Sequence, residues 1–179
     1  MDWTRTLPRH TALLGALLAL LAACKKDGGA AVPYYGCGKV SGFHRTDLNG
    51  AHFGDSDTTD WNWRDQWCAK VDALFPWRPV QYTEAAPDSL VIACYPNPAR
   101  LGHAFVIGFY HGGVTYADFR FDDAGFNLLA ARDSVPGHAV YFDVNGLGIS
   151  QPQLVRAYYR AFRADGTAFR GHGDVRIMP

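Results

Sequence analysis

The chain has 179 residues, of which 48% are hydrophobic and 14% are aromatic. This hydrophobic content excludes an intrinsically disordered chain, and the length fits one domain of ordinary size. Lys and Arg together number 17, as do Asp and Glu, so the formal net charge is zero. A chain without excess positive charge lacks the electrostatic pattern of nucleic-acid-binding proteins, and we expect no nucleic-acid partner.

The first 23 residues have the pattern of an export signal. Arg5 and Arg9 flank the start of an apolar run over residues 11–23, which is shorter than the roughly 20 residues of a membrane-spanning helix. The run ends in Leu21-Ala22-Ala23-Cys24, which resembles the lipobox of bacterial lipoproteins. The resemblance implies that residues 1–23 are removed, that the thiol of Cys24 is diacylated, and that the new amino terminus is usually acylated as well.

Two or three acyl chains hold a protein firmly on a membrane, so we expect a lipid-anchored protein whose residues 24–33 form a short polar tether. Lys25 stands where some lipoproteins have the Asp that retains them at the inner membrane. We therefore expect the outer membrane of a diderm bacterium, with both the surface and the periplasmic face open.

Three further cysteines, Cys37, Cys68 and Cys94, would lie in an oxidising compartment. They allow one internal disulfide with three alternative pairings, and they leave one thiol over. We expect one structural pair and a buried third cysteine. No Cys-x-x-Cys spacing indicates a metal or redox site.

Residues 34–88 form an extension that we expect to pack on the domain after it. Its helical signal is an apolar stripe at Trp63, Trp67, Val71 and Leu74. Asn62 and Asp65 resemble a capping box at the start, and Pro76 would end the helix. The pattern predicts one α-helix over residues 63–75.

From residue 89 to the end, apolar and polar residues alternate with the period of two that is typical of strands. Turn residues, such as Gly112-Gly113 and Asp122-Asp123-Ala124-Gly125, separate the segments. Strands are expected over residues 90–95, 103–109, 114–121, 126–131, 139–144, 154–163 and 168–178. Short strands at this spacing predict an antiparallel β-sandwich over residues 89–179.

The alternation also assigns side chains to faces. Ala117, Phe119 and Phe121 should share the buried face of their strand, opposite Asp118 and Arg120. On a later strand Arg156 and Arg160 share a face with Tyr158. We expect this charged face to be the solvated outer side of the sheet, with a cation–π ladder or an anion-binding patch as alternatives.

The last 85 residues resemble the C-terminal sorting domains of type IX secretion cargo. The resemblance rests on Tyr95-Pro96-Asn97-Pro98-Ala99, on the Asp-x-x-Gly hairpin at residues 122–125, and on Phe142-Asp143-Val144-Asn145-Gly146-Leu147. It implies an immunoglobulin-like β-sandwich. The chain departs from that family in its lipobox and in lacking a Lys-rich end, so the fold and the class of bacterium are carried over without the secretion role.

Catalytic motifs are missing from the sequence. None of the five serines lies in a Gly-x-Ser-x-Gly elbow, and with Glu84 as the single Glu, a glycosidase pair would have to be two Asp. We therefore expect no enzyme activity, and an Asp-based or Cys-based enzyme is the third class considered.

Two groups of residues are candidates for ligand binding. Asp55, Asp57 and Asp60 lie in a Gly/Ser/Thr loop and are candidate calcium ligands, although a solvated acidic loop that caps the following helix is the favoured explanation. Indole rings are suitable platforms for sugar faces, or else they form a small core at one end of the sheet. The four indole candidates are Trp61, Trp63, Trp67 and Trp77.

Together these observations predict a lipid-anchored cell-envelope β-sandwich with a non-catalytic binding or scaffolding role. The alternative is a surface glycan-binding module that uses the four tryptophans. No cofactor is expected, with calcium at the Asp loop as the less favoured alternative, and the sequence leaves the protein or glycan partner unidentified.

Overall fold

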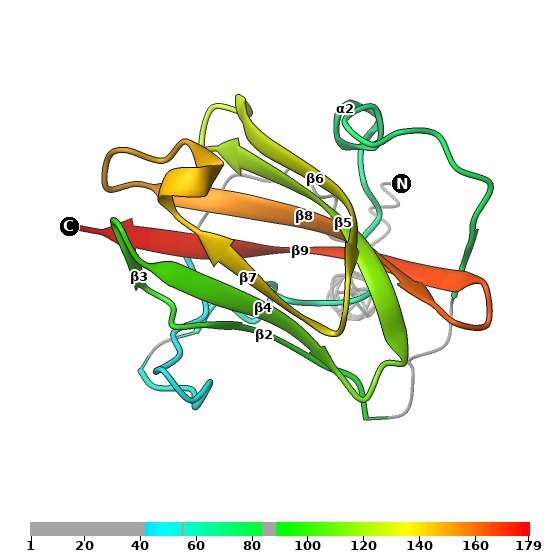
Figure 1. Ribbon diagram of the computed structural model, residues 1–179, viewed down its shortest axis with the longest axis horizontal. Helices are drawn as coiled ribbons and strands as arrows, with labels where there is room; N and C mark the ends of the chain where they lie inside the picture. The colour runs from blue at the N-terminus through cyan, green and yellow to red at the C-terminus, as the bar shows by residue number, and fades with distance from the viewer. Residues whose placement is uncertain (1–41, 55, 84–88) are drawn as a thin grey trace, which may run out of the picture. The chain divides into compact units, whose positions relative to one another are not determined.

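Two β-sheets make up most of the structure, a computed structural model that describes residues 42–54, 56–83 and 89–179. Residues 33–179 belong to one compact unit, and within it the two sheets pack face to face in a sandwich-like arrangement (Figure 1). The prediction of a mainly β protein with two packed sheets is confirmed. The lipobox, the tether and the Cys37 position fall outside the described residues.

The larger sheet has six strands, in the order β1-β9-β8-β5-β6, with β3 pairing with β9 outside this path. Its strands are β1 (Gln81–Tyr82), β3 (Ala99–Arg100), β5 (Val114–Asp123), β6 (Leu128–Pro136), β8 (Leu154–Arg163) and β9 (Thr167–Met178). The smaller sheet has the order β2-β4-β7, with β2 (Val91–Tyr95), β4 (Ala104–Tyr110) and β7 (Ala139–Asp143). All strand pairs are antiparallel except β1 with β9 and β3 with β9.

Each of the seven longer strands corresponds to a segment predicted from the alternating pattern. The largest difference is at β6, which continues five residues beyond the predicted end at residue 131, to Pro136. A short 3₁₀ helix, η1 (Asn145–Leu147), follows β7. The pattern was reliable here because each strand has one face in the core, which imposes a strict period of two.

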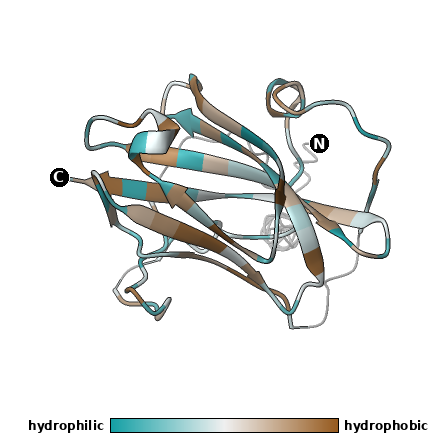
Figure 2. Cartoon of the chain, in the orientation of Figure 1, coloured by the Kyte–Doolittle hydropathy of each residue, from teal (hydrophilic) through white to brown (hydrophobic). Residues whose placement is uncertain are grey.

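The core lies between the two sheets and is rich in phenylalanine. Ring centroids of Phe119 and Phe121 in β5 both lie 4.9 Å from that of Phe142 in β7, in edge-to-face contacts. Phe105 in β4 stacks on Phe142 at 5.6 Å. The predicted buried face of β5 is therefore confirmed, and β4 is apolar along most of its length (Figure 2).

The predicted helix over residues 63–75 is wrong, because the only α-helix among the described residues is α2 (Ala69–Asp72). Residues before it lie in extended backbone along β9, and Asp65 donates its N–H to a carbonyl of that strand. Two residues of the predicted apolar stripe, Trp67 and Val71, are nevertheless buried against the outer face of the larger sheet. Tertiary pairing with a strand edge has overridden the helical period.

Strand β9 has one side against β8, and its other edge is closed by short segments from earlier in the chain. In a strand the backbone groups of alternate residues point to the same edge. Four carbonyls of even-numbered β9 residues accept backbone N–H groups: Ala168 from Thr83 at 2.8 Å, Arg170 from Asp65 at 3.0 Å, His172 from Trp61 at 2.8 Å, and Met178 from Leu101 at 2.9 Å. The strand therefore offers no open edge there to another chain.

Two glycines of β9 permit this close approach. A Cβ at Gly171 would lie 1.9 Å from the carbonyl oxygen of Asn62, and a Cβ at Gly173 would lie 2.2 Å from the ring of Trp61. Any side chain at either position would force the segment around residues 61–62 away from the strand. The Gly-His-Gly sequence in β9 is thus explained by the chain that packs on it.

Asn97, between the two prolines of the Pro-Asn-Pro motif, closes the rest of the edge with its side chain. Its Nδ2 donates to the carbonyls of Asp174 at 2.8 Å and His44 at 2.9 Å. Its Oδ1 accepts the N–H of Arg176 at 2.9 Å. The side chain is fully buried and acts as an additional peptide group between β9 and the segment at residue 44.

We expect Asn97→Ala to lower the free energy of unfolding by about 3 kcal/mol, because three buried hydrogen bonds are lost at about 1 kcal/mol each. Urea unfolding monitored by tryptophan fluorescence measures the change. Asn49→Ala, in an exposed turn, is the control and should change the free energy by less than about 0.5 kcal/mol. Equal effects of the two substitutions would contradict the role assigned to Asn97.

Candidate functional site

Charged side chains line the outer face of the larger sheet, and they are buried. Seven ionisable residues of β5, β8 and β9 on this face are at most 5% exposed, whereas Arg170 and Arg176 of β9 are half-buried. The seven are Asp118, Arg120, Asp122, Arg156, Arg160, His172 and Asp174. The expectation that Arg156, Tyr158 and Arg160 lie on a solvated face is therefore wrong. The segment around α2 covers this side of the sheet, and period-two alternation cannot reveal a cover formed by a distant part of the chain.

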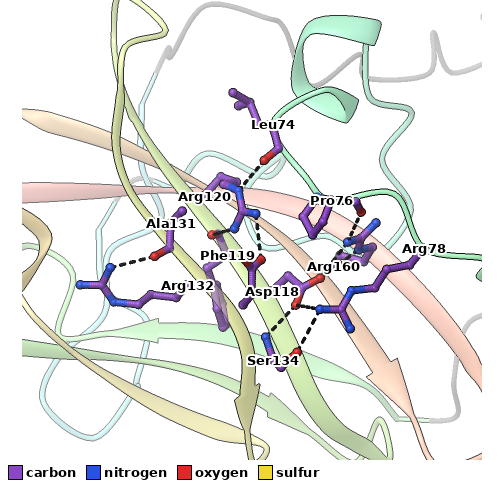
Figure 3. A network of polar contacts seen from close by, with 11 residues as sticks. Leu74, Pro76, Arg78, Asp118, Phe119, Arg120, Ala131, Arg132, Ser134 and Arg160 are labelled. Atoms are coloured by element: carbon purple, nitrogen blue, oxygen red, sulfur yellow. Dashed lines mark hydrogen bonds and ion pairs between the residues drawn. The ribbon is translucent and has the colours of Figure 1, made fainter.

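Asp118 is the centre of one half of this buried network (Figure 3). Its Oδ2 pairs with Nη2 of Arg160 at 2.8 Å, and its Oδ1 accepts the N–H of Ser134 at 2.8 Å and lies 3.6 Å from Nη2 of Arg78. Arg160 also donates to the carbonyl of Pro76 at 3.0 Å. The carboxylate thereby joins β5, β6 and β8 to the segment that follows α2.

Arg120 repeats this arrangement on the neighbouring part of β5. Its guanidinium donates to the carbonyl of Leu74 at 2.6 Å and pairs with Asp133 at 2.8 Å. The ring of Phe75 lies 4.7 Å from the Arg120 guanidinium and 5.2 Å from that of Arg160. Both guanidinium groups thus make cation–π contacts with the ring of Phe75, whose π electrons attract the positive charges.

The second half of the network lies toward the C-terminal end of β9. Arg156 and Asp174 form a bidentate ion pair, with Nε–Oδ1 at 2.7 Å and Nη2–Oδ2 at 2.8 Å. Asp65 hydrogen bonds with Nδ1 of His172. Asp60 accepts the N–H of His44 at 2.9 Å and the N–H of Asp174 at 3.2 Å. These contacts attach residues 44–65 to the sheet.

Two carboxyl groups in this region have raised pKa values. Burial, together with the charge of the nearby carboxylate of Asp174, raises the pKa of Asp60 to about 8, although the hydrogen bond from the His44 N–H opposes both effects. Burial also raises the pKa of Asp174, against the hydrogen bond and charge of Arg156. The pair therefore holds protons more tightly in the folded protein than in the unfolded chain.

Asp122 is a separate buried carboxyl at the end of β5. It is 1% exposed, and neither of its oxygens has a hydrogen-bond partner. Burial, reinforced by the charge of Asp123, raises its pKa to about 6, against the opposing charges of Lys70 and Arg120. An ionised carboxylate without partners is costly in such a place, so this group should destabilise the fold above pH 6.

The four tryptophans predicted as a ligand platform are not exposed together. Trp61 and Trp67 are 7% and 6% exposed, and Trp63 packs against the main core. Only Trp77 is open, at 87% exposure. Trp61 stacks on Tyr159 at 6.3 Å and Trp67 on Phe75 at 4.6 Å. Trp61 and Trp67 therefore belong to the interior, and Trp63 is half-buried against the core, so the four indoles form no common exposed platform.

The two described carboxylates of the predicted calcium loop, Asp57 and Asp60, are engaged by hydrogen bonds within the protein. Asp57 accepts the N–H of Thr59 at 2.9 Å and its hydroxyl at 2.6 Å, and Asp60 accepts two backbone N–H groups as described above. Asp55 lies outside the described residues. Within the described ranges, no group of three or more His, Cys, Asp or Glu side chains is placed to hold a metal ion.

Of the cysteines, Cys94 is a free thiol in the core. Burial raises the pKa of this thiol well above its ordinary value, which is the opposite of what a nucleophilic cysteine requires. Cys68 is disulfide-bonded. The sequence left the pairing among Cys37, Cys68 and Cys94 open, and since Cys94 is free, the partner of Cys68 is not among the described residues.

The smaller sheet has an outer face that sequence reasoning did not single out. We call it the tyrosine face, after Tyr95, Tyr110 and Tyr141. Its outward residues on the three strands are Val91, Ala93, Tyr95, Ala104, Val106, Gly108, Tyr110, Ala139, Tyr141 and Asp143. Hydrophobicity did not distinguish this face, because most residues of β2, β4 and β7 are apolar or aromatic on both sides of these strands.

Comparison with known proteins gives no match to any protein-family model, curated protein or solved structure. Across the part of the chain that the structure describes, no helix is long and apolar enough to cross a membrane. The residues themselves therefore carry the functional argument.

We expect the stability of the protein to fall as pH rises from about 4 to 8, with Asp60 as a main cause. Its pKa is raised from 3.8 to about 8 in the folded state, so the native state binds more protons across this interval and loses that stabilisation as pH rises. Asp60→Asn cannot ionise, and urea unfolding at several pH values should show a smaller fall. An exposed control, Asp143→Asn, should retain the fall, and an unchanged profile in Asp60→Asn would contradict this assignment.

Between pH 5 and pH 8, the difference in unfolding free energy between Asp122→Asn and the wild type should shift in favour of the variant by about 1 kcal/mol. The wild-type carboxyl, with its pKa raised to about 6, must ionise in a buried place above that pH, whereas the amide does not. Thermal unfolding at the two pH values measures the effect. The neighbouring Asp123→Asn, in the exposed hairpin, should give no such gain.

Proposed function

We propose that this chain is a lipid-anchored protein of the cell envelope that acts by binding, without catalysis. The anchor is Cys24, supported by the sequence Leu21-Ala22-Ala23-Cys24 at the end of an apolar run. Its place is the outer membrane of a diderm bacterium. The described domain would then be presented at a membrane, on a tether of about ten residues.

The observation that carries the binding role is an inverted distribution of polarity on the two outer faces. Antiparallel sheets usually turn polar residues outward to solvent. Here the outer face of the larger sheet has the charges and is covered, whereas the tyrosine face has a single charged side chain, Asp143, and Tyr141 is 77% exposed there. Exposed apolar surface of this kind marks interaction sites in proteins.

The buried charges support a non-catalytic role, because their partners are structural. Asp118 and Arg120 contact the segment after α2, and Asp174 contacts Arg156. Each of these groups attaches one part of the chain to another. The network accounts for its own residues without a substrate, and it makes residues 44–83 a fixed part of the domain that presents the tyrosine face.

We further propose that the sandwich is immunoglobulin-like and related to the type IX sorting domains. The support is the Pro96-Asn97-Pro98 turn that follows β2, the Asp-x-x-Gly hairpin between β5 and β6, and the two packed sheets. A role in secretion is not part of this proposal.

Replacing the anchor cysteine tests the proposal directly. In cells fed labelled palmitate, the wild-type chain should incorporate label and sediment with membranes, while Cys24→Ala should lose the label and leave the membrane fraction, because two acyl chains bind a bilayer far more strongly than none. Cys94→Ala, which alters a buried core thiol, should keep the label. Labelled Cys24→Ala, or an unlabelled wild type, would contradict the anchor.

A further inference from the structure

We propose that the tyrosine face binds a neutral polysaccharide, a chain of uncharged sugar rings. The inference rests on the proposed binding role and gives it a ligand class. It also moves the sugar-binding surface from the tryptophans to the opposite side of the molecule's core, to β2, β4 and β7.

The three tyrosines converge because of the register of the smaller sheet. Tyr95 in β2 and Tyr141 in β7 both pair with Val106 of β4, so they flank it in one row across the sheet. Neighbouring strands are about 4.8 Å apart, which separates the two outer backbones by about 10 Å. Tyr110 lies four residues further along β4, opposite Val91, but its side chain returns toward this row.

Gly108 lets the ring of Tyr110 lie against the sheet. A Cβ at residue 108 would be 2.4 Å from the ring of Tyr110, so any side chain there would displace it. The hydroxyl of Tyr110 hydrogen bonds with that of Tyr95, and the phenol of Tyr141 is close enough to affect its titration. A ring that covers a glycine and is held at its hydroxyl is preorganised, so less conformational freedom is lost on binding.

The chemistry of the face selects among ligands. Fixed aromatic rings favour a flat ligand with an apolar side, and the face has no Lys or Arg to recruit an anion. Burial raises the pKa of Tyr110 to about 12, with the hydrogen bond to Tyr95 adding to the effect, so its hydroxyl remains a neutral donor and acceptor at ordinary pH. The exposed carboxylate of Asp143 is an additional acceptor at one end.

A sugar chain satisfies both requirements at once. Its rings present C–H groups to aromatic faces, and its hydroxyls can pair with the phenol groups and with Asp143. A purely apolar partner would cover the hydroxyl of Tyr141 without replacing its hydrogen bonds to water, which is costly. An acidic polysaccharide would meet the negative charge of Asp143, and none of the outward residues of β2, β4 and β7 is Lys or Arg.

The test uses the full-length protein in a detergent without sugar head groups, titrated calorimetrically with hexasaccharides of β-1,3-glucose, β-1,4-glucose, α-1,4-glucose, mannose and N-acetylglucosamine. At least one should bind. Tyr141→Ala should weaken that binding about tenfold or more, equivalent to about 1.4 kcal/mol, while its thermal midpoint stays near that of the wild type. Tyr141→Phe should lie between the two. Trp77→Ala, which removes another exposed ring, should bind as the wild type does.

Three results would overturn the proposal. These are an absence of binding by all five hexasaccharides, loss of binding in Trp77→Ala with Tyr141→Ala unaffected, and a concentration-dependent dimer that Tyr141→Ala abolishes, which would assign the face to a second copy of the chain. Each of them leaves palmitate labelling of Cys24 unchanged, so a failure of the ligand assignment is distinct from a failure of the anchor.

Discussion

The closure of the β9 edge is the constraint on which the rest of the structure depends. Alternate backbone groups of this strand bond to residues 61, 65, 83 and 101, and to the side chains of Asp60 and Asn97. These partners lie about 70 to 115 residues earlier in the chain. A strand edge left open would expose the same groups to other chains. By pairing with it, the N-terminal part of the described chain becomes part of the sandwich.

This pairing also explains where the charges lie. Once residues 60–78 follow β9 and cross the outer face of the larger sheet, the polar side chains beneath them lose water and need partners within the protein. The partners are carboxylates: Asp118 pairs with Arg160, Asp133 with Arg120, and Asp174 with Arg156. Arg120 and Arg160 also donate to the carbonyls of Leu74 and Pro76 in the covering segment. Such buried pairs contribute little net stability, but breaking one is costly. We interpret them as fixing the position of the cover.

The sequence predicts much of the sandwich and little of the candidate site. Period-two alternation finds all seven longer strands and places Phe119 and Phe121 in the core, because burial of one face imposes that period. The helical period misleads for residues 63–75, where Trp63, Trp67 and Val71 recur at a helical spacing that arises from contacts with a distant sheet. Period-two alternation fails for Arg156 and Arg160, since burial of a polar face depends on what covers it. The tyrosine face escapes notice because Tyr95, Tyr110 and Tyr141 lie far apart in sequence, and only the strand register brings them together.

Native-state hydrogen exchange tests the central claim most directly. If residues 60–83 are an integral part of the sandwich, the amides of Trp61, Asp65 and Thr83 should exchange only with global unfolding, with the same free energy as amides in β5 and β8. If these three amides exchange with a much smaller free energy while β5 and β8 remain protected, the segment is a loosely docked extension. In that case neither the closed edge of β9 nor the buried charges would define the fold.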